Sequence, residues 1–334
     1  MDKKKLARVI ATIIISFVMF SVFTLDILTL VLCNKYEKNY TVLTEDFSYS
    51  NGNDRIHFLN TGNSDCILLE SNGHFALIDS GEGDFNPRKT TEYEGYKDEV
   101  LNYIKKVAKN SNGEVYLDFI LGTHNHYDHI GNFYEIISDD EIKIGRAYFK
   151  KYNKEIATEL EQDGWDNVAT YEAIISAINE KKIILIEALP DWEFNFGDFK
   201  LQFINTVTPE ELNGKGENAN SVGVIVTKGE KRAFLAADFT KSSGLEDLYG
   251  EKIGDVDLLK IGHHGYYGSS SQKFLKQLKP EIAICTNFLG KIYPNVKWNL
   301  TMVAKVPIYA TAHRNGIIAS FTDDGEIVLT EKIM

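Results

Sequence analysis

The chain has 334 residues, which is long enough for one large domain or two small ones. A hydrophobic content of 43% and a charged content of 25% are ordinary for a globular protein. The formal net charge is −12. A surface with this charge repels a polyanion on average, so the composition disfavours broad nucleic-acid binding, although a local basic patch is compatible with it.

The N-terminal segment has the composition of a membrane-spanning helix. Residues 9–32 are apolar or small and polar except for Asp26, and about 20 such residues suffice to cross a bilayer. The basic residues before it place its N-terminal side in the cytoplasm by the positive-inside rule. A cleaved signal peptide would have a shorter apolar core and a small-residue cleavage site. We therefore expect a cytoplasmic tail at 1–8, a transmembrane signal anchor at 9–33, and a single-pass cell-membrane protein whose remaining residues lie outside the cytoplasm.

The rest of the chain reads as a stalk followed by one globular domain. Residues 34–53 are polar and turn-rich, which is typical of a linker, and strand patterns begin directly after them. Three cysteines, two of them inside apolar runs, do not form a disulfide framework, so Cys66 and Cys285 are expected in the core. We expect the domain to cover 54–334.

Predicted strands come in two groups, and helices follow each group. The first group has strands at 56–59, 66–70, 75–79, 117–121, 147–149 and 183–186, with helices at 96–108, 132–137 and 154–181. The second has strands at 201–204, 222–226, 233–236, 258–261, 282–286, 308–310, 317–321 and 327–330, with helices at 241–248 and 271–278. Two sheets packed face to face with helices outside would bring the polar residues at the strand ends to one edge, namely Asp79, His124, Asp238 and His263.

The segment 123–129, Thr-His-Asn-His-Tyr-Asp-His, places three imidazoles and a carboxylate within six residues after a buried strand. Polar titratable groups crowded in this way cost free energy unless something satisfies them. A metal ion satisfies all four, because imidazole nitrogen and carboxylate oxygen suit zinc, and a hydrolytic site keeps one position open for water. The alternative, a solvated polar loop, does not explain why four such ligands converge. We therefore predict a metal site at this segment.

The pattern His124-x-His126-x-Asp128-His129, with Asp79-x-Gly81 before it and Asp238 and His263 after it, resembles the metallo-β-lactamase superfamily. The resemblance covers nearly all of the chain after the anchor and implies an α+β fold, a four-layer αββα sandwich. Within the superfamily, segments 56–60, 70–81 and 117–121 are most similar to extracytoplasmic phosphorylcholine esterases of Gram-positive bacteria. The next similarity is to the hydrolase domain of competence DNA-uptake channel proteins, which His263-His264-Gly265 with Ser269-Ser270 resembles more.

The resemblance also implies which residues hold two divalent metal ions, expected to be Zn²⁺. His124 and His126 would bind the first metal, and Asp128, His129 and His263 the second. Asp238 would bridge the two, and Asp79 would hold the histidine loop by hydrogen bonds. Many members supply a third histidine to the first metal, but no histidine occurs between His129 and His263 here. Asn218 or Asn220 stands where that ligand would come.

Several residues have both a functional and a structural interpretation. Asp238 could instead cap the helix that follows it. His264 is either a hydrogen-bonding neighbour of the substrate or a structural ring; in the first case it acts in catalysis with Asp128 and Asp238. Asn220 and Ser221 could serve the metal or cap a strand, and His313 is expected in a turn that could reach the cleft. Aromatic residues expected to form a choline-type pocket are Trp165, Tyr171, Tyr266, Tyr267, Phe288 and Trp298.

Three functions are compatible with these features. The first is a membrane-anchored, extracytoplasmic, binuclear metal hydrolase that cleaves a cell-envelope phosphodiester, such as phosphorylcholine on teichoic acid. The second is a competence-type nuclease of the same fold, which the acidic composition disfavours. The third is a non-catalytic envelope binding or sensor module that retains one metal, and the missing histidine supports it; the substrate of the first could also be another small polar molecule. No protein partner is evident from the sequence.

Overall fold

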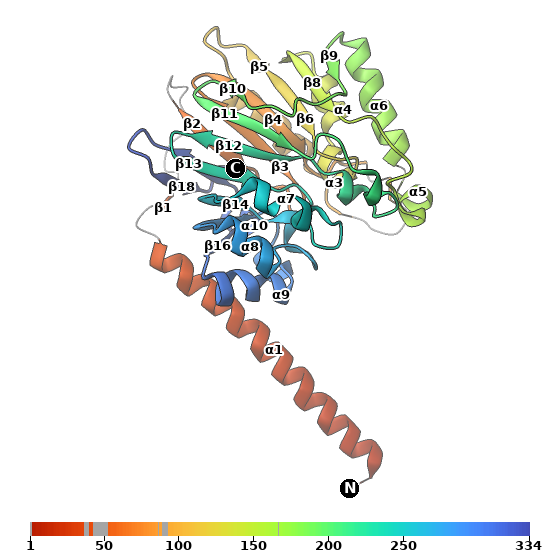
Figure 1. Ribbon diagram of the computed structural model, residues 1–334, viewed down its shortest axis with the longest axis vertical. Coiled ribbons are helices and arrows are strands. Elements are labelled where there is room, and N and C mark those ends of the chain that lie inside the picture. The colour runs from red at the N-terminus through yellow and green to blue at the C-terminus, as the bar shows by residue number, and fades with distance from the viewer. Residues whose placement is uncertain (1, 37–39, 43–52, 86, 89–92, 166) are drawn as a thin grey trace.

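The computed structural model describes residues 2–36, 40–42, 53–85, 87–88, 93–165 and 167–334. Two sheets form its centre (Figure 1). The first has the order β1 (Tyr40–Val42), β18 (Ile327–Glu331), β17 (Ile317–Phe321), β2 (Asp54–Phe58), β3 (Cys66–Ser71), β4 (His74–Ser80), β6 (Phe119–Gly122), β8 (Arg146–Phe149) and β9 (Ile184–Ile186). The second has the order β10 (Phe194–Phe196), β11 (Phe199–Ile204), β12 (Gly223–Lys228), β13 (Lys231–Leu235), β14 (Leu258–Lys260), β15 (Ile282–Cys285) and β16 (Ile308–Ala310). Strands β5 (Val115–Leu117) and β7 (Ile142–Ile144) form a separate pair.

Alternate residues of the strands face different layers, as a period of two requires. Ile67 and Leu69 of β3 belong to the core between the sheets, together with Leu201 and Phe203 of β11. Leu68, between them on β3, packs outward against helices α2 (Lys97–Val107), α4 (Phe133–Ser138) and α6 (Asn167–Glu180).

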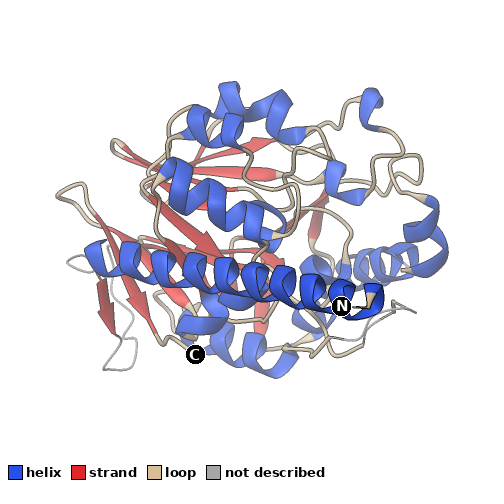
Figure 2. Cartoon of the chain, turned by 90° about the horizontal axis from the view of Figure 1, so that it is seen from below, coloured by secondary structure: helices blue, strands red, loops and turns tan. Residues whose placement is uncertain are grey.

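A third cluster packs helices α7 (Leu245–Ile253) and α8 (Gln272–Leu278) on the outer face of the second sheet, together with α9 (Pro294–Lys297) and the helical turns of η6 (Trp298–Ala304). Figure 2 shows the strands between the outer helices, with the long helix α1 running across them. The predicted α+β fold with four αββα layers is therefore confirmed.

The segment after Asp238 differs from its prediction. Helix α7 begins at Leu245 rather than near residue 241. The preceding residues form a turn in which Ser243 N donates to Thr240 Oγ1 at 2.9 Å and Ser243 Oγ donates to the Thr240 carbonyl at 2.9 Å. Asp238 therefore does not cap this helix, and its carboxylate points elsewhere.

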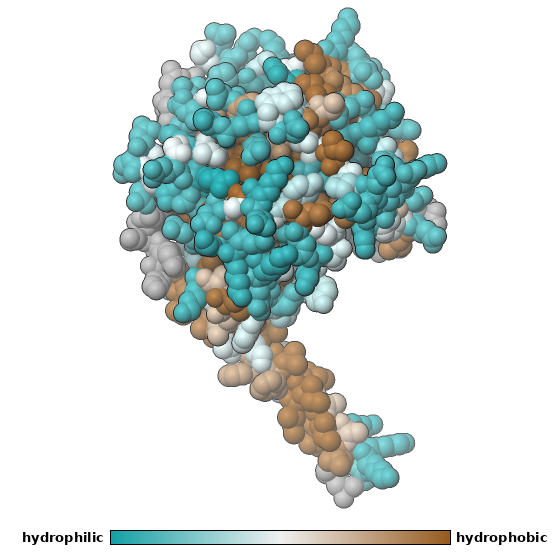
Figure 3. Space-filling view, in the orientation of Figure 1, coloured by the Kyte–Doolittle hydropathy of each residue, from teal (hydrophilic) through white to brown (hydrophobic). Residues whose placement is uncertain are grey.

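The N-terminal segment forms helix α1 (Lys3–Tyr36), which is long and apolar enough to cross a membrane and could anchor the protein there. Figure 3 shows it as a brown apolar rod projecting from a mostly hydrophilic face. Part of the expected stalk belongs to the domain, because Tyr40–Val42 pairs in parallel with β18. Positions 37–39 and 43–52 of that stalk lie outside the described residues. Cys66 and Cys285 are buried and unbridged, as predicted.

Candidate metal centre

Four strand ends meet at one edge of the sandwich and supply the candidate site. Asp79 ends β4, the histidine loop follows β6, Asp238 follows β13, and His263 and His264 follow β14. Asp79, Ala237, His263 and His264 have φ values between +43° and +57°, in the left-handed region that side chains with a Cβ disfavour. Strained backbone of this kind persists where the surrounding structure fixes it, and it is common at functional sites.

On one side of the site, His129 and His264 face each other. Their Nε2 atoms are 3.1 Å apart. His129 Nδ1–H donates to Asp79 Oδ2 at 2.7 Å, and His264 Nδ1 lies 3.2 Å from Thr286 Oγ1 and 3.3 Å from Asp65 Oδ1. Because the Nδ1 atom of each ring is already used, the Nε2 lone pairs are directed at the shared space.

Asp65 is a functional residue that the sequence reasoning missed. Its buried carboxylate forms an ion pair with the ammonium of Lys260, which is fully buried, and accepts a hydrogen bond from Thr286. Burial raises the pKa of Asp65, but Lys260 and the nearby imidazoles outweigh it, so the carboxyl stays ionised. The signal available in the sequence was a charged residue directly before the apolar run of β3, but its partners lie 195 and 221 positions away.

On the other side, His124 and His126 form a second pair, with His124 Nε2 and His126 Nδ1 3.1 Å apart. Thr123 Oγ1 donates to Asp79 at 2.8 Å and lies 3.1 Å from His124 Nδ1, from which it can therefore accept. His126 Nε2–H donates to Glu161 Oε1 at 2.8 Å. Glu161, from helix α5 (Glu159–Gly164), is a second residue that the sequence reasoning missed.

The two nitrogen pairs test whether a metal fits. In each pair, two imidazole lone pairs point at each other across 3.1 Å, an arrangement that is repulsive unless a cation lies between or beside them. Without a metal, protons can take that role. Burial lowers the pKa of His264, but Asp238 and Asp65 outweigh it and raise the pKa to about 9. Burial, with His129 and His126 nearby, holds the pKa of His124 well below its usual range. The donor set is imidazole and carboxylate, which suits a divalent transition metal.

Asp238 lies between the two histidine pairs. Its Oδ1 is 3.1 Å from His129 Nε2 and 3.4 Å from His264 Nε2. Its Oδ2 is 3.7 Å from His124 Nε2 and 3.8 Å from His263 Nε2. Both oxygens are buried, and within the described part of the chain neither accepts a hydrogen bond from a side chain or backbone donor meeting standard geometry. A carboxylate placed in this way can bridge two metal ions, as the resemblance implied.

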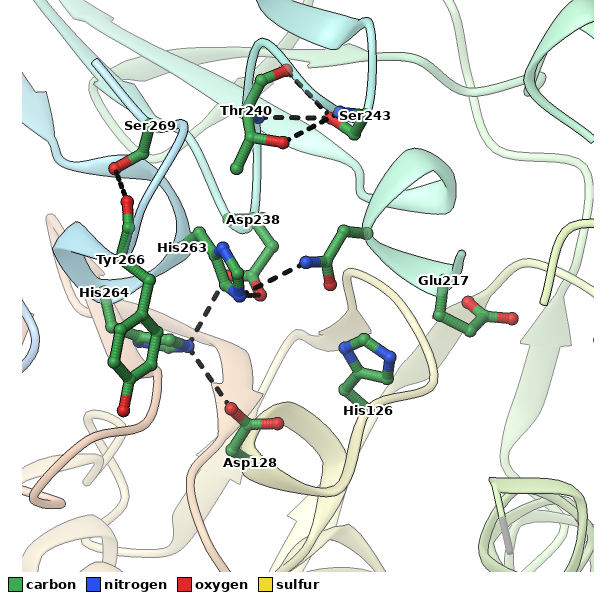
Figure 4. A network of polar contacts seen from close by, with 12 residues as sticks. His126, Asp128, Glu217, Asp238, Thr240, Ser243, His263, His264, Tyr266 and Ser269 are labelled. Carbon is green, nitrogen blue, oxygen red and sulfur yellow. Dashed lines mark hydrogen bonds and ion pairs between the residues drawn. The ribbon is translucent and has the colours of Figure 1, made fainter. Parts of the chain in front are cut away.

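The structure places His264, and not His263, beside His129. We expected His263 beside His129, but His264 takes that position, and its Nε2 is 3.5 Å from Asp128 Oδ2 (Figure 4). His263 lies on the Oδ2 side with the His124 pair, and Asn218 Nδ2 donates to its Nε2 at 3.3 Å. The physical reason is the backbone: consecutive left-handed residues turn the two rings to different sides. His263 therefore stands on the side where a third histidine was missing.

The remaining predicted residues divide into those at the site and those away from it. Asp128 reaches the site, and Asp79 supports both histidine pairs through His129 and Thr123. Asn220 instead bonds to Lys150 and Thr208, and the Ser221 hydroxyl is buried without a partner in the described structure. His313 is exposed on the short helix α10 (Thr311–Arg314) and does not line the cleft.

An open cleft of about 290 Å³ gives access to the centre. His126, Asp128, Asp238 and His263 line it, together with two cations, Arg88 and Lys215. Of the six aromatic residues expected to form a pocket, Trp165 and Tyr266 line this cleft, and Tyr93 joins them. Tyr171 is buried against Tyr152 instead.

Comparison with known proteins agrees with this geometry. The model of the metallo-beta-lactamase superfamily matches residues 59–286. The chain belongs to this superfamily. Recombination protein 2 of Haemophilus influenzae is 22% identical over 233 residues, which are 70% of this chain and 24% of that protein. ComE operon protein 3 of Bacillus subtilis is 26% identical over 168 residues, 50% of this chain and 20% of that protein.

These two matches support the expected similarity to competence proteins, although the chain spans only about a quarter or less of their length. Among solved structures, the metallo-beta-lactamase fold protein YhfI from Bacillus subtilis aligns with a TM-score of 0.46 at 13% identity. That alignment covers 79% of this chain and 98% of YhfI.

Proposed function

We propose that this protein is a membrane-anchored metal-dependent hydrolase that cleaves phosphodiesters of the cell envelope, with its domain outside the cytoplasm. The observation that carries the proposal is the Asp238 carboxylate, whose two oxygens face two different histidine pairs. When bound, divalent ions supply Lewis-acid activation of water and neutralise charge on phosphoryl oxygens. His124, His126 and His263 would hold one ion, and Asp128, His129 and His264 the other.

The residues of the cleft favour an anionic substrate with an apolar or cationic group. The Arg88 guanidinium forms an ion pair with Glu82, lies 3.7 Å from Asp128 Oδ1 and lines the cleft, where a guanidinium suits phosphate oxygens. Burial raises the pKa of Asp128, but His264, His129 and Arg88 hold it well below its usual range, so Asp128 stays a carboxylate and is a poor proton acceptor. Trp165, Tyr266 and Tyr93 supply several rings around one opening, which cation–π recognition of a quaternary ammonium group requires.

The test uses the full chain purified in detergent. Metal content is measured, and hydrolysis is followed with a chromogenic phosphorylcholine ester, a simple chromogenic diester and single-stranded DNA. We expect about two zinc ions per chain and release of the chromogenic group, with the phosphorylcholine ester cleaved faster than the simple diester. Asp238→Ala should lower the rate by roughly 10³-fold or more, and the exposed Asp191→Ala is the matched control.

A nuclease is the second candidate, and the matches to Recombination protein 2 and ComE operon protein 3 favour it. Faster cleavage of DNA than of either chromogenic ester would replace our assignment with this one. A protein that carries two metals but cleaves no phosphodiester would overturn the proposal, and one that carries a single metal and cleaves none would support the third alternative, a non-catalytic binding or sensor module.

A further inference from the structure

The membrane helix does not end in a free linker but packs on the domain. The last turns of α1 lie against α9, η6 and β16 (Figure 1). Leu25, Thr29 and Cys33, which lie on one side of the helix at spacings of four, are buried there. Cys33 Sγ donates to the Ile308 carbonyl at 3.2 Å and joins the core between the two sheets.

A charge pair fixes the same junction. Asp26, the single acidic residue in the apolar run, forms an ion pair with Lys297 of α9, whose ammonium side chain is 1% exposed. Removing Asp26 would leave the buried Lys297 ammonium without a carboxylate partner, so the pair favours the docked orientation of the helix. The apolar length left to cross a bilayer is then residues 9–25, about 26 Å at 1.5 Å per residue, which is at the lower end of the lengths that span the hydrocarbon core. The domain must therefore begin at the membrane surface.

The part of the domain that flanks this junction has the composition of a membrane interface. Here we define the α9–η6 surface as the exposed residues Lys291, Tyr293, Trp298, Met302, Val303 and Lys305. Trp and Tyr are enriched at the level of lipid headgroups, and basic residues near a span attract anionic lipids. The stretch from Ile282 to Thr322 contains no acidic residue, and of its four basic residues Lys297 pairs with Asp26 and Arg314 with Glu331, which leaves the exposed Lys291 and Lys305 to charge the surface. This local excess of positive charge occurs in a chain of net charge −12.

We propose that the α9–η6 surface lies in the headgroup region of an anionic lipid bilayer beside α1. We expect lipid to cover this surface, because the surface is continuous with helix α1, whose exposed apolar part is long enough to enter the membrane. The same surface connects to the metal centre: the Tyr293 ring lies 5.7 Å from that of Tyr266, which lines the cleft. The contact therefore holds the cleft at a fixed distance from the bilayer surface, which suits a substrate presented at or near the membrane.

Tryptophan fluorescence of the full chain in lipid nanodiscs tests the proposal. The chain has three tryptophans. Trp165→Phe with Trp192→Phe leaves Trp298 alone, whereas Trp165→Phe with Trp298→Phe leaves Trp192, which is 65% exposed and serves as the control. In phosphatidylglycerol nanodiscs with bromine near the headgroup, we expect the Trp298 emission to fall by roughly half and the Trp192 emission by less than about a tenth. Circular dichroism verifies that both variants are folded.

Two results would overturn the proposal. A red-shifted Trp298 emission that brominated lipid leaves unchanged would place this surface in water. A blue-shifted emission that bromine does not quench would mean that protein covers the surface, for example a second copy of the chain. Replacing phosphatidylglycerol by phosphatidylcholine should reduce the Trp298 quenching, and Lys291→Glu with Lys305→Glu should reduce it in phosphatidylglycerol, because both changes weaken the attraction to anionic headgroups. None of these readouts depends on hydrolysis.

Discussion

The two sides of Asp238 are held in place by different parts of the fold. On one side, here called the His129 half, the Nδ1 atoms of His129 and His264 contact two buried carboxylates, those of Asp79 and Asp65 respectively. On the other side, here called the His124 half, His124 contacts the Thr123 hydroxyl and His126 contacts Glu161 of the short helix α5. Because Asp79 also holds the Thr123 hydroxyl, the two halves differ mainly at His126, whose position depends on how α5 is placed.

The largest expected effect comes from the Asp65–Lys260 ion pair under the His129 half. Asp65→Ala leaves the fully buried Lys260 ammonium unpaired, which should lower the free energy of unfolding by about 3–5 kcal/mol. Urea denaturation of the metal-free full chain in detergent measures it. Asp140→Ala, which breaks an exposed pair with Lys181, is the control and should cost less than about 1 kcal/mol. Equal losses in the two variants would mean that the core does not support this half.

The next effect concerns the support of His126. Glu161→Gln should weaken metal binding in the His124 half by roughly 10–100-fold, because the imidazole loses its anionic partner. The zinc affinity of the His129 half should not change. Titration with zinc against a competing chelator resolves the two steps. The exposed Glu159→Gln in the same helical turn is the control. Weakening of both steps together would show that the halves are not independent.

The two halves should also differ in their dependence on pH. A metal binds neutral imidazole, and the pKa of His264 in the metal-free protein is raised to about 9, so a proton must leave this ring below pH 9. Burial lowers the pKa of His129, but Asp238 and Asp79 outweigh it and raise the pKa well above its usual value, so affinity in the His129 half should fall at least about tenfold per unit as the pH decreases from 9 to 7. In the His124 half, burial holds the pKa of His124 low and only His126, where Glu161 outweighs burial, has a raised pKa, so the dependence should be weaker. Calorimetry in buffers of different ionisation enthalpy counts the released protons, and equal release in both steps would contradict the comparison.

The smallest effect concerns the cap of α5. Thr158 Oγ1 donates to Glu161 Oε2 at 2.7 Å and accepts from Glu161 N at 3.3 Å. Thr158→Ala should therefore cost about 1 kcal/mol of stability and also weaken the His124 half a few-fold. Ser271→Ala, which removes the cap of α8, should cost a similar stability with no change in metal affinity. If both variants leave zinc affinity unchanged, α5 does not position His126.

Much of the fold was predictable because its signals are local. The apolar runs of β3 and β4, the apolar length of α1 and the six-residue His-x-His-x-Asp-His cluster depend only on neighbouring residues. The segments that were missed or misplaced depend on distant contacts. The helical turns of η6 were not expected, and α7 starts four residues late because the Thr240–Ser243 turn competes with the helix.

The sequence by itself determined that a metal-type cluster follows β6, that Asp238 belongs with it, and that an apolar helix precedes the domain. Only the tertiary structure decided that Asp65, Lys260 and Glu161 support the cluster, that His264 rather than His263 faces His129, and that Asp26 pairs with Lys297. The reason is that the residue type alone tells which side chains can bind a metal. Which side chains meet, and which way each ring points, depends on strand ends that packing brings together and on the left-handed backbone at His263 and His264.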